Sequence, residues 1–149
     1  MVAVVGPADA PEPICAAARE VGLLLARRGV TVVTGGLGGV MAAAAEGARD
    51  GGGLVVGLLP GTDRTSGNPH LNVAIPTGLG QARNALVVGS ADAVIAVGGS
   101  WGTLSEVALS HRADTPVVWL AGWTIHDAAG ARVPIETADS PEQAVARVS

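Results

Sequence analysis

The chain has 149 residues, of which 48% are hydrophobic and 15% charged, and its only aromatic residues are three tryptophans. Its formal net charge of −4, with nine arginines and no lysine, gives no basic surface for a nucleic-acid polymer or an anionic membrane. No apolar run reaches the roughly 18 residues of a membrane span, and the single cysteine, Cys15, excludes an internal disulfide. Since the N-terminus also lacks the basic segment of a signal peptide, we expect one cytoplasmic domain over residues 1–149.

The first half of the chain alternates apolar strands with amphipathic helices. Val2–Val5 is an all-apolar run that Gly6-Pro7 ends, and Asp9, Pro11 and Glu12 then mark the start of a helix, with Asp9 or Ala10 near its N-cap. That helix carries apolar residues at helical spacing and stops before Gly29. Further along, the pattern predicts a strand over 30–34, a helix over 40–50 and a strand over 54–59.

The second half continues the alternation after a polar, turn-rich loop over residues 61–70. The predicted elements are a strand over 71–75, a helix over 80–89, a strand over 93–97, a helix from about 103 to 113 and a strand over 116–120. Residues 121–139 are ambiguous, with an edge strand near Val133–Glu136 as one interpretation. A last helix covers residues 140–148, with Ser140 as its N-cap and Pro141 at its first position.

Strands that alternate with helices of ten or more residues require right-handed crossovers, which build a parallel sheet. We therefore predict a single doubly wound, Rossmann-like α/β sheet of about six or seven strands with helices on both faces. Ligands of such sheets bind beyond the carboxyl ends of the strands. Two glycine clusters, at residues 35–39 and 98–102, fall at such ends, so the sequence predicts a binding site there.

The second glycine cluster has the features of an anion site. It connects a buried strand to a helix that we expect to begin near Thr103. The first amides of a helix lack intrahelical partners and lie at the positive end of its dipole. Glu106 lies one turn into this helix, and two roles are open for it. It is either a carboxylate that faces the ligand or the glutamate of a capping box with Thr103.

Position on the helices gives two further expectations. On a helical wheel Leu104 and Val107 share one face with His111, and Glu106 points away from it, so we expect Glu106 outside the core-facing side. Arg83 stands in the first turn of its helix, where a cation opposes the dipole. We therefore expect an anionic partner for Arg83, which is Glu106, a ligand or both. The three histidines lack metal-ligand spacing, and no metal is expected.

Two common nucleotide-binding motifs are absent. The dinucleotide fingerprint places G-x-G-x-x-G directly after the first strand, whereas here the glycines follow the second strand. Met41 also stands where that fingerprint has its third glycine. The phosphate loop of ordinary NTPases needs a lysine, which the chain lacks.

The two glycine clusters resemble those of the Lonely Guy (LOG) family. Gly36-Leu37-Gly38-Gly39-Val40-Met41 looks like the family's first glycine motif, and Gly98-Gly99-Ser100-Trp101-Gly102-Thr103-Leu104-Ser105-Glu106 is similar to its PGGxGTxxE signature. Arg83 lies nine residues before Asp92. This is the offset between the family's arginine and the acidic residue that opens its next strand. The sequence departs from that signature at Gly98, Ser100 and Ser105, and from the family's arginine motif in the residues that flank Arg83. These departures make it more similar to a sister branch that includes molybdenum-cofactor carrier proteins.

The resemblance implies a function and a set of site residues. Family members of known activity are nucleoside 5′-monophosphate phosphoribohydrolases, which release the base from ribose 5-phosphate. By this resemblance Arg83 and Glu106 match the catalytic pair, no cofactor is required, and the chain forms a homodimer. The residues implied for phosphate and nucleotide binding are Gly36, Gly38, Gly39, Met41, Gly98, Gly99, Ser100, Trp101, Gly102 and Thr103, with Asn84 as a further candidate.

Several alternatives stay open beside that reading. The protein is alternatively a non-catalytic carrier or sensor that binds a nucleotide or a phosphorylated pterin, the molybdenum cofactor, in the same pocket. A structural subunit with an unused pocket is a third interpretation. The glycines at 35–39 either admit a ligand or form a tight turn. Trp101 either stacks on a base or joins a subunit contact, while Trp119 and Trp123 are interpreted as packing residues.

Overall fold

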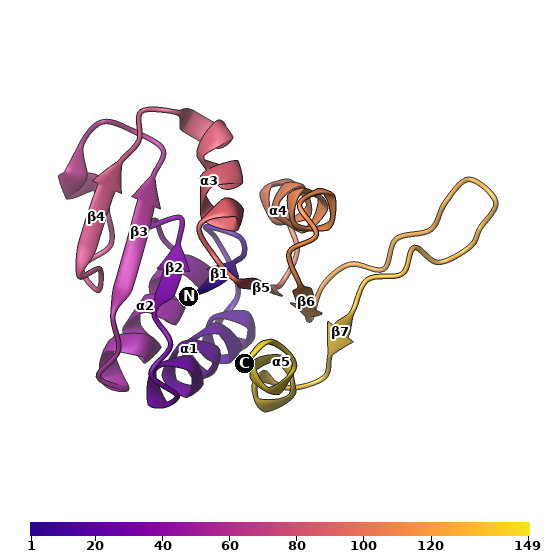
Figure 1. Cartoon of the computed structure of the whole chain (residues 1–149), viewed down its shortest axis with the longest axis horizontal. Coiled ribbons are helices and arrows are strands. Elements are labelled where there is room, and N and C mark those ends of the chain that lie inside the picture. Colours follow the sequence, from indigo (N-terminus) through magenta and orange to yellow (C-terminus); the bar gives the residue numbers. More distant parts are fainter.

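The computed structural model of the protein describes all 149 residues and contains one seven-stranded sheet (Figure 1). The strands are β1 (Val2–Val5), β2 (Val32–Thr34), β3 (Val55–Leu59), β4 (Val73–Pro76), β5 (Ala93–Val97), β6 (Val117–Leu120) and β7 (Thr137–Ala138). They lie in the order β4-β3-β2-β1-β5-β6-β7, and every neighbouring pair is parallel. The order reverses between β1 and β5, as in a doubly wound sheet, and the predicted fold class is confirmed.

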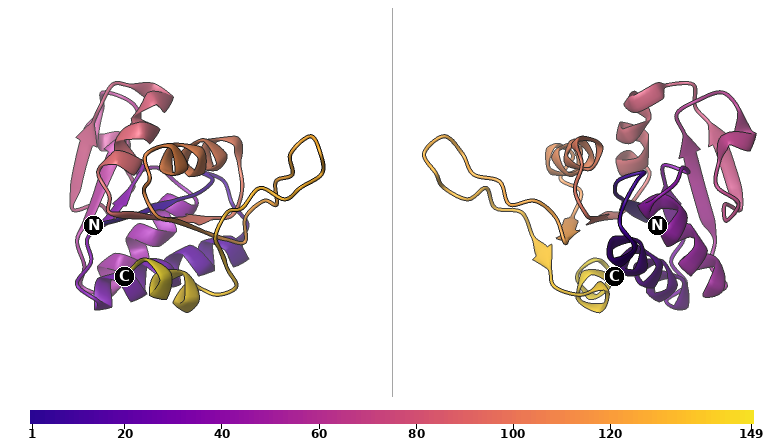
Figure 2. Two further views of the ribbon diagram at one scale, coloured as in Figure 1. Left: turned by 45° about the vertical axis from the view of Figure 1, so that its right-hand side comes forward. Right: turned by 180° about the vertical axis from the view of Figure 1, so that it is seen from behind.

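Five α-helices cover the two faces of this sheet. They are α1 (Glu12–Arg27), α2 (Val40–Asp50), α3 (Arg83–Gly89), α4 (Trp101–Arg112) and α5 (Pro141–Val148), and there are two short 3-10 helices, η1 (Arg64–Ser66) and η2 (Gly80–Ala82). α1, α2 and α5 pack on one face, and α3 and α4 on the other (Figures 1 and 2). No helix combines the length and the apolar character that crossing a bilayer requires.

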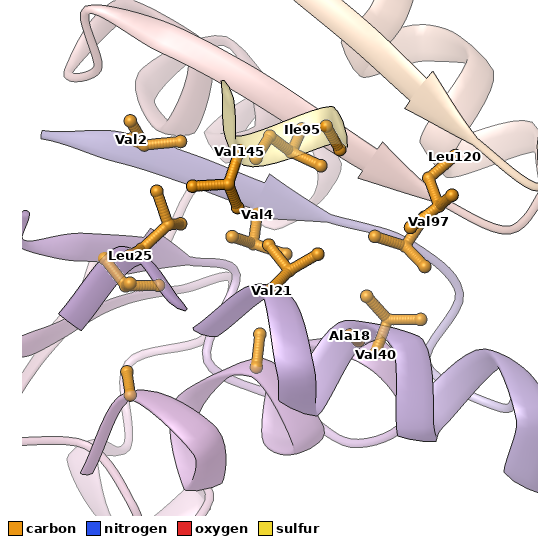
Figure 3. Packing of buried hydrophobic residues seen from close by; sticks show 14 of the residues in the cluster. Val2, Val4, Ala18, Val21, Leu25, Val40, Ile95, Val97, Leu120 and Val145 are labelled. Atoms are coloured by element: carbon orange, nitrogen blue, oxygen red, sulfur yellow. The ribbon is translucent and has the colours of Figure 1, made fainter. Parts of the chain in front are cut away.

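The core consists almost entirely of small aliphatic side chains. The cluster on the α1, α2 and α5 face has 21 buried residues, among them Val4, Val21, Leu25 and Ile95 (Figure 3). The cluster on the other face has 11, and Trp119 is its one aromatic member. Because helices cover both faces, the central strands read as continuous apolar runs instead of alternating ones.

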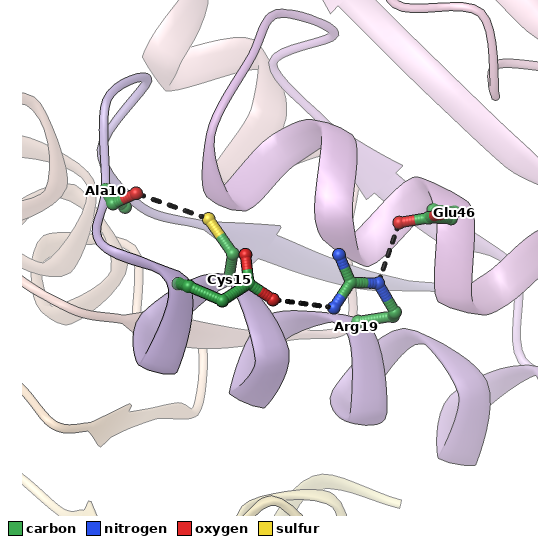
Figure 4. A network of polar contacts seen from close by, with 5 residues as sticks. Ala10, Cys15, Arg19 and Glu46 are labelled. Carbon is green, nitrogen blue, oxygen red and sulfur yellow. Dashed lines mark hydrogen bonds and ion pairs between the residues drawn. The ribbon is translucent and has the colours of Figure 1, made fainter.

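α1 and α2 pack backbone against backbone. A Cβ at Gly47 would overlap the carbonyl oxygen of Arg19, and one at Gly22 would overlap that of Ala44, so only glycine permits this approach. Arg19 also links the two helices at the surface, where its Nε donates to Glu46 at 2.7 Å (Figure 4). This hydrogen bond lowers the pKa of Glu46.

Some element ends differ from their predicted positions. α1 has Pro11 as its N-cap and no side chain caps it, so Asp9 does not have the predicted role. Cys15, a half-buried free thiol on this helix, donates to the carbonyl oxygen of Ala10 at 3.5 Å (Figure 4). Ser140 caps α5 as predicted, since its hydroxyl accepts from the Gln143 amide.

Between β6 and β7 the chain leaves the sheet as an arm, residues 121–136, whose far end projects from the body (Figures 1 and 2). Nearer its base, Ile125 and Ile135 pack against the core. An antiparallel bridge between His126 and Arg132 holds the arm together, and the Val133 amide donates to the Ile125 carbonyl at 2.7 Å. The predicted edge strand exists but is displaced. It covers Thr137–Ala138, because all four of the predicted residues, 133–136, still belong to the arm.

Candidate functional site

A cavity of about 390 Å³ opens at the carboxyl ends of β1 and β5, where the strand order reverses. Doubly wound sheets bind their ligands at this position. Four segments line the cavity: the loop after β1, the start of α2 with the loop before it, the start of α3, and the first turns of α4. The lining residues are Gly6, Pro7, Ala8, Leu37, Met41, Gln81, Arg83, Asn84, Ser100, Trp101, Gly102, Thr103, Ser105 and Glu106.

α4 points its N-terminus at this cavity. The helix begins at Trp101, two residues earlier than predicted, and Ser100 is its N-cap. The Ser100 hydroxyl accepts from the Thr103 amide at 3.2 Å and lies 2.9 Å from the Thr103 hydroxyl. Of the two roles left open for Glu106, the capping box with Thr103 is therefore wrong, because Ser100 is the N-cap of the helix. The amides of Trp101 and Gly102 keep no intrahelical partner and are available to an anion.

The two serine caps of the protein provide a matched pair of substitutions. Ser100→Ala and Ser140→Ala are each expected to lower the free energy of unfolding by about 1 kcal/mol, because each removes one cap of the same geometry. Only Ser100→Ala is expected to weaken phosphate binding as well, since Ser100 lines the cavity. Urea unfolding and calorimetric titration with phosphate measure the two effects. Equal phosphate affinity in the two variants would contradict this placement of the anion site.

Arg83 is buried at the start of α3 with its guanidinium in the cavity wall. One terminal nitrogen donates to the Asn84 side chain, and the other lies 3.4 Å from the carbonyl oxygen of Gly35. A Cβ at Gly35 would collide with the guanidinium, so this glycine makes room for it. The Nε–H of Arg83 is buried and has no partner. The arginine is therefore held in place while part of its hydrogen-bonding capacity stays unused.

Asn84 connects α3 to α4 beside the arginine. Its amide nitrogen donates to the Ser105 hydroxyl at 3.1 Å, and that hydroxyl donates to the Gly102 carbonyl at 2.6 Å. This chain of hydrogen bonds fixes the position of Arg83 relative to the first turn of α4. Asn84 thus positions Arg83, and Ser105, which the sequence analysis named only as a departure from the family signature, takes part in the same network.

Glu106 is the second ionisable group of the cavity, and only 6% of it is exposed. Burial raises the pKa of Glu106 from its ordinary value of 4.5 to about 8, and the positive charge of Arg83 lowers it in part. The two side chains line the same cavity but form no direct ion pair. At pH 7 Glu106 is therefore mostly neutral, and Arg83 carries the only full charge in the cavity.

The wheel-based expectation for Glu106 is wrong. The buried residues of α4 are Thr103, Glu106, Val107 and Ser110, whereas His111 is exposed. Three of the four buried residues of α4 are polar, while Leu104 and Leu109 are only partly buried. Apolar periodicity cannot identify an inward face of that kind.

The structure brings together most of the predicted site residues. Arg83, Asn84, Met41 and the segment Ser100–Thr103 line the cavity together with Glu106. The remaining five glycines are not among the lining residues: Gly36, Gly38, Gly39, Gly98 and Gly99. Added Cβ atoms at these positions would meet the protein itself: Leu59 at Gly36, Pro7 and Ala8 at Gly39, and Trp123 at Gly99. They support the turns that shape the cavity.

Sequence reasoning missed one wall of the cavity. Gly6, Pro7 and Ala8 come from the loop after β1, and Leu37 and Gln81 extend the lining. A signal for the first group is present in the sequence, because Gly6-Pro7 ends the first strand and carboxyl ends of strands were the predicted location. Leu37 and Gln81 carry no comparable signal.

Comparisons with known proteins match this sequence and this fold. The model of the SLOG cluster4 family matches residues 1–146. The structure is similar to that of the molybdenum cofactor binding protein from Rippkaea orientalis, with 35% identity over 97% of this chain and 92% of that one and a TM-score of 0.87. It is also similar to the molybdenum cofactor carrier protein of Chlamydomonas reinhardtii, with 34% identity, the same two coverages and a TM-score of 0.82. An uncharacterized protein of Archaeoglobus fulgidus is 42% identical over 111 residues, which are 74% of this chain and 73% of that protein.

Proposed function

The chain belongs to the SLOG cluster4 family, and from this premise we propose that it binds a small phosphorylated ligand in the cavity beside α4 and carries molybdenum cofactor. The observation that carries the proposal is a buried arginine beside free helix amides, in a cavity whose only carboxyl group is mostly neutral at pH 7. Helix amides and a guanidinium are the groups that proteins use for phosphate. A volume of about 390 Å³ lies within the range of small-molecule sites.

The same residues fit the chemistry of molybdenum cofactor, which is a phosphorylated pterin. Its phosphate would bind at the Trp101 and Gly102 amides and at Arg83, whose charge forms no ion pair within the chain. A neutral Glu106 adds no repulsion to an anionic ligand. The two similar structures at 34–35% identity, described as molybdenum cofactor binding and carrier proteins, support this choice of ligand.

Hydrolysis of a nucleoside 5′-monophosphate is the second candidate function. Arg83 and Glu106, which match the LOG catalytic pair, do line one cavity. An oxocarbenium-like ribose, however, needs an ionised carboxylate beside it. Because burial raises the pKa of Glu106 to about 8, only a minority of molecules carry that charge at pH 7. The carrier function is therefore the better supported of the two.

One experiment separates the two functions. Protein purified from cells that make molybdenum cofactor is denatured and oxidised, and the fluorescent pterin released is measured. A second portion is incubated with AMP, GMP, CMP and IMP, and free base is sought by chromatography. We expect bound pterin and no base. Base release that is lost in a folded Glu106→Gln variant would establish the hydrolase and overturn the carrier.

We also propose a homodimer located in the cytoplasm. Large exposed apolar side chains occur on neighbouring segments of the chain, at Val73 and Ile75 of β4, at Leu79 and at Leu86 of α3. Such residues are commonly covered in oligomers. Sedimentation equilibrium would return about twice the chain mass of 14.6 kDa for the dimer.

A further inference from the structure

All aromatic residues of the chain lie in one row beside the cavity. The sequence has three tryptophans, no tyrosine and no phenylalanine. The ring centroids of Trp119 and Trp123 are 6.5 Å apart, and those of Trp123 and Trp101 are 5.4 Å apart with the planes at 85°. The exposed fraction rises along this row, from 1% at Trp119 through 39% at Trp123 to 79% at Trp101. The row thus runs from the core to the mouth of the cavity.

The inner members of the row are anchored. The indole N–H of Trp119 donates to the carbonyl oxygen of Gly98 at 2.6 Å, which ties the core end to the turn before α4. Trp123 packs against Gly99, where a Cβ would overlap its indole ring. Gly99 therefore leaves space for the aromatic ring of Trp123. Trp119 is a packing residue, as predicted from the sequence.

Trp101 differs from both because it combines a fixed position with an exposed ring. It is the first residue of α4, it lines the cavity, and its amide is one of those free to bind an anion. Trp123 holds it through an edge-to-face contact, a favoured geometry for aromatic pairs. A tryptophan with 79% of its surface in water gains little from folding, so packing within the chain does not account for its presence at this position.

We propose that Trp101 determines ligand specificity by stacking on the planar, fused heteroaromatic ring of a ligand whose phosphate binds at the α4 N-terminus. This inference rests on the proposed function, because it assumes the phosphate site. The phosphate donors and the ring platform belong to the same residue and its neighbours, so a ligand that carries both groups contacts them together. A phosphorylated pterin has such a ring, and inorganic phosphate or glycerol phosphate has none.

The test compares two ligands and three proteins. Wild type, Trp101→Leu and Trp101→Phe are titrated by calorimetry with a pterin monophosphate and with glycerol phosphate. We expect Trp101→Leu to weaken binding of the pterin monophosphate by about 5- to 150-fold, the range for one ring stacked on one aromatic side chain. The affinity for glycerol phosphate should change less than about twofold, because this ligand has no ring that could stack on Trp101. Trp101→Phe should restore most of the affinity for the pterin ligand.

Tryptophan emission provides an independent readout. Stacking of a pterin on Trp101 is expected to quench the emission of the wild-type protein. The quench should be smaller in Trp101→Phe even though the affinity is retained, because Trp119 and Trp123 do not line the cavity. An unchanged quench in that variant would contradict the assignment of the stacking to Trp101.

The remaining outcomes are also decisive. If Trp101→Leu loses the same affinity for both ligands, Trp101 supports the fold, and the stacking role is overturned. If the sedimentation mass changes as well, Trp101 supports a subunit contact, and the stacking role is likewise overturned. In that case the phosphate site and the proposed function remain. Failure of the wild-type protein to bind either ligand would instead overturn the phosphate site and the stacking role with it.

Discussion

Glu106→Gln is expected to be more stable than the wild type at pH 8 and above, and equally stable at pH 4. Burial favours the protonated form of Glu106, so the folded protein holds this proton more tightly than the unfolded chain does. In the wild-type protein the neutral carboxyl therefore makes its full contribution to the free energy of unfolding below about pH 4.5. This contribution is lost as the pH rises to about 8. Glutamine has a similar shape and no proton to lose. The gain at high pH is a few kcal/mol, with about 5 kcal/mol as its upper bound.

Urea unfolding at intervals between pH 4 and 9 measures this difference in the absence of ligand. Glu46→Gln is the control, because Arg19 lowers the pKa of Glu46 and its contribution has the opposite pH dependence. Parallel stability profiles for wild type and Glu106→Gln would contradict a buried, neutral Glu106. The same variant also tests the function. If the protein is a carrier, Glu106→Gln should keep its affinity for an anionic ligand, and above pH 8 this affinity should exceed that of the wild type.

Arg83→Met is expected to abolish most ligand binding and to leave the folded protein intact. Removing one partner of a desolvated charge contact costs 2–5 kcal/mol or more, so affinity for a phosphorylated ligand should fall by at least about 30-fold. Stability at pH 6 should change by less than about 1 kcal/mol, because the buried charge and its unpartnered Nε–H disappear together. If Arg83 served folding alone, Arg83→Met would lower the free energy of unfolding and leave the ligand affinity of the folded protein unchanged.

Calorimetric titration and urea unfolding of the same samples test this separation. Arg112→Met is the matched control, since Arg112 is exposed at the far end of α4 and its loss changes the net charge equally. In Arg83→Met the pKa of Glu106 should rise further, because Arg83 no longer lowers it. Retained affinity in Arg83→Met, or a collapse of the fold at pH 6, would contradict the assigned role.

The sequence predicted the sheet better than it predicted the details of the site. Buried strands such as Ala93–Val97 are apolar throughout, and glycines mark their carboxyl ends, so pattern alone identifies both the strands and the edge where ligands bind. Glu106 was misplaced because the inward side of α4 is largely polar, and a wheel that counts apolar residues assigns such a side to solvent. The glycines at 36, 38 and 39 were ambiguous because a motif cannot distinguish a turn that admits a ligand from one that admits a neighbouring loop.

The arm, residues 121–136, has a consequence for how the protein tolerates damage. It projects into solvent, and Arg132 within it is exposed, so trypsin would meet this peptide bond before those of the body. The chain beyond the cut still contains α5, whose Ala144 and Val145 are buried in the main core. A nicked molecule would thus migrate as two fragments under denaturing conditions and as one particle otherwise, with the cavity and all three indole rings on the longer fragment.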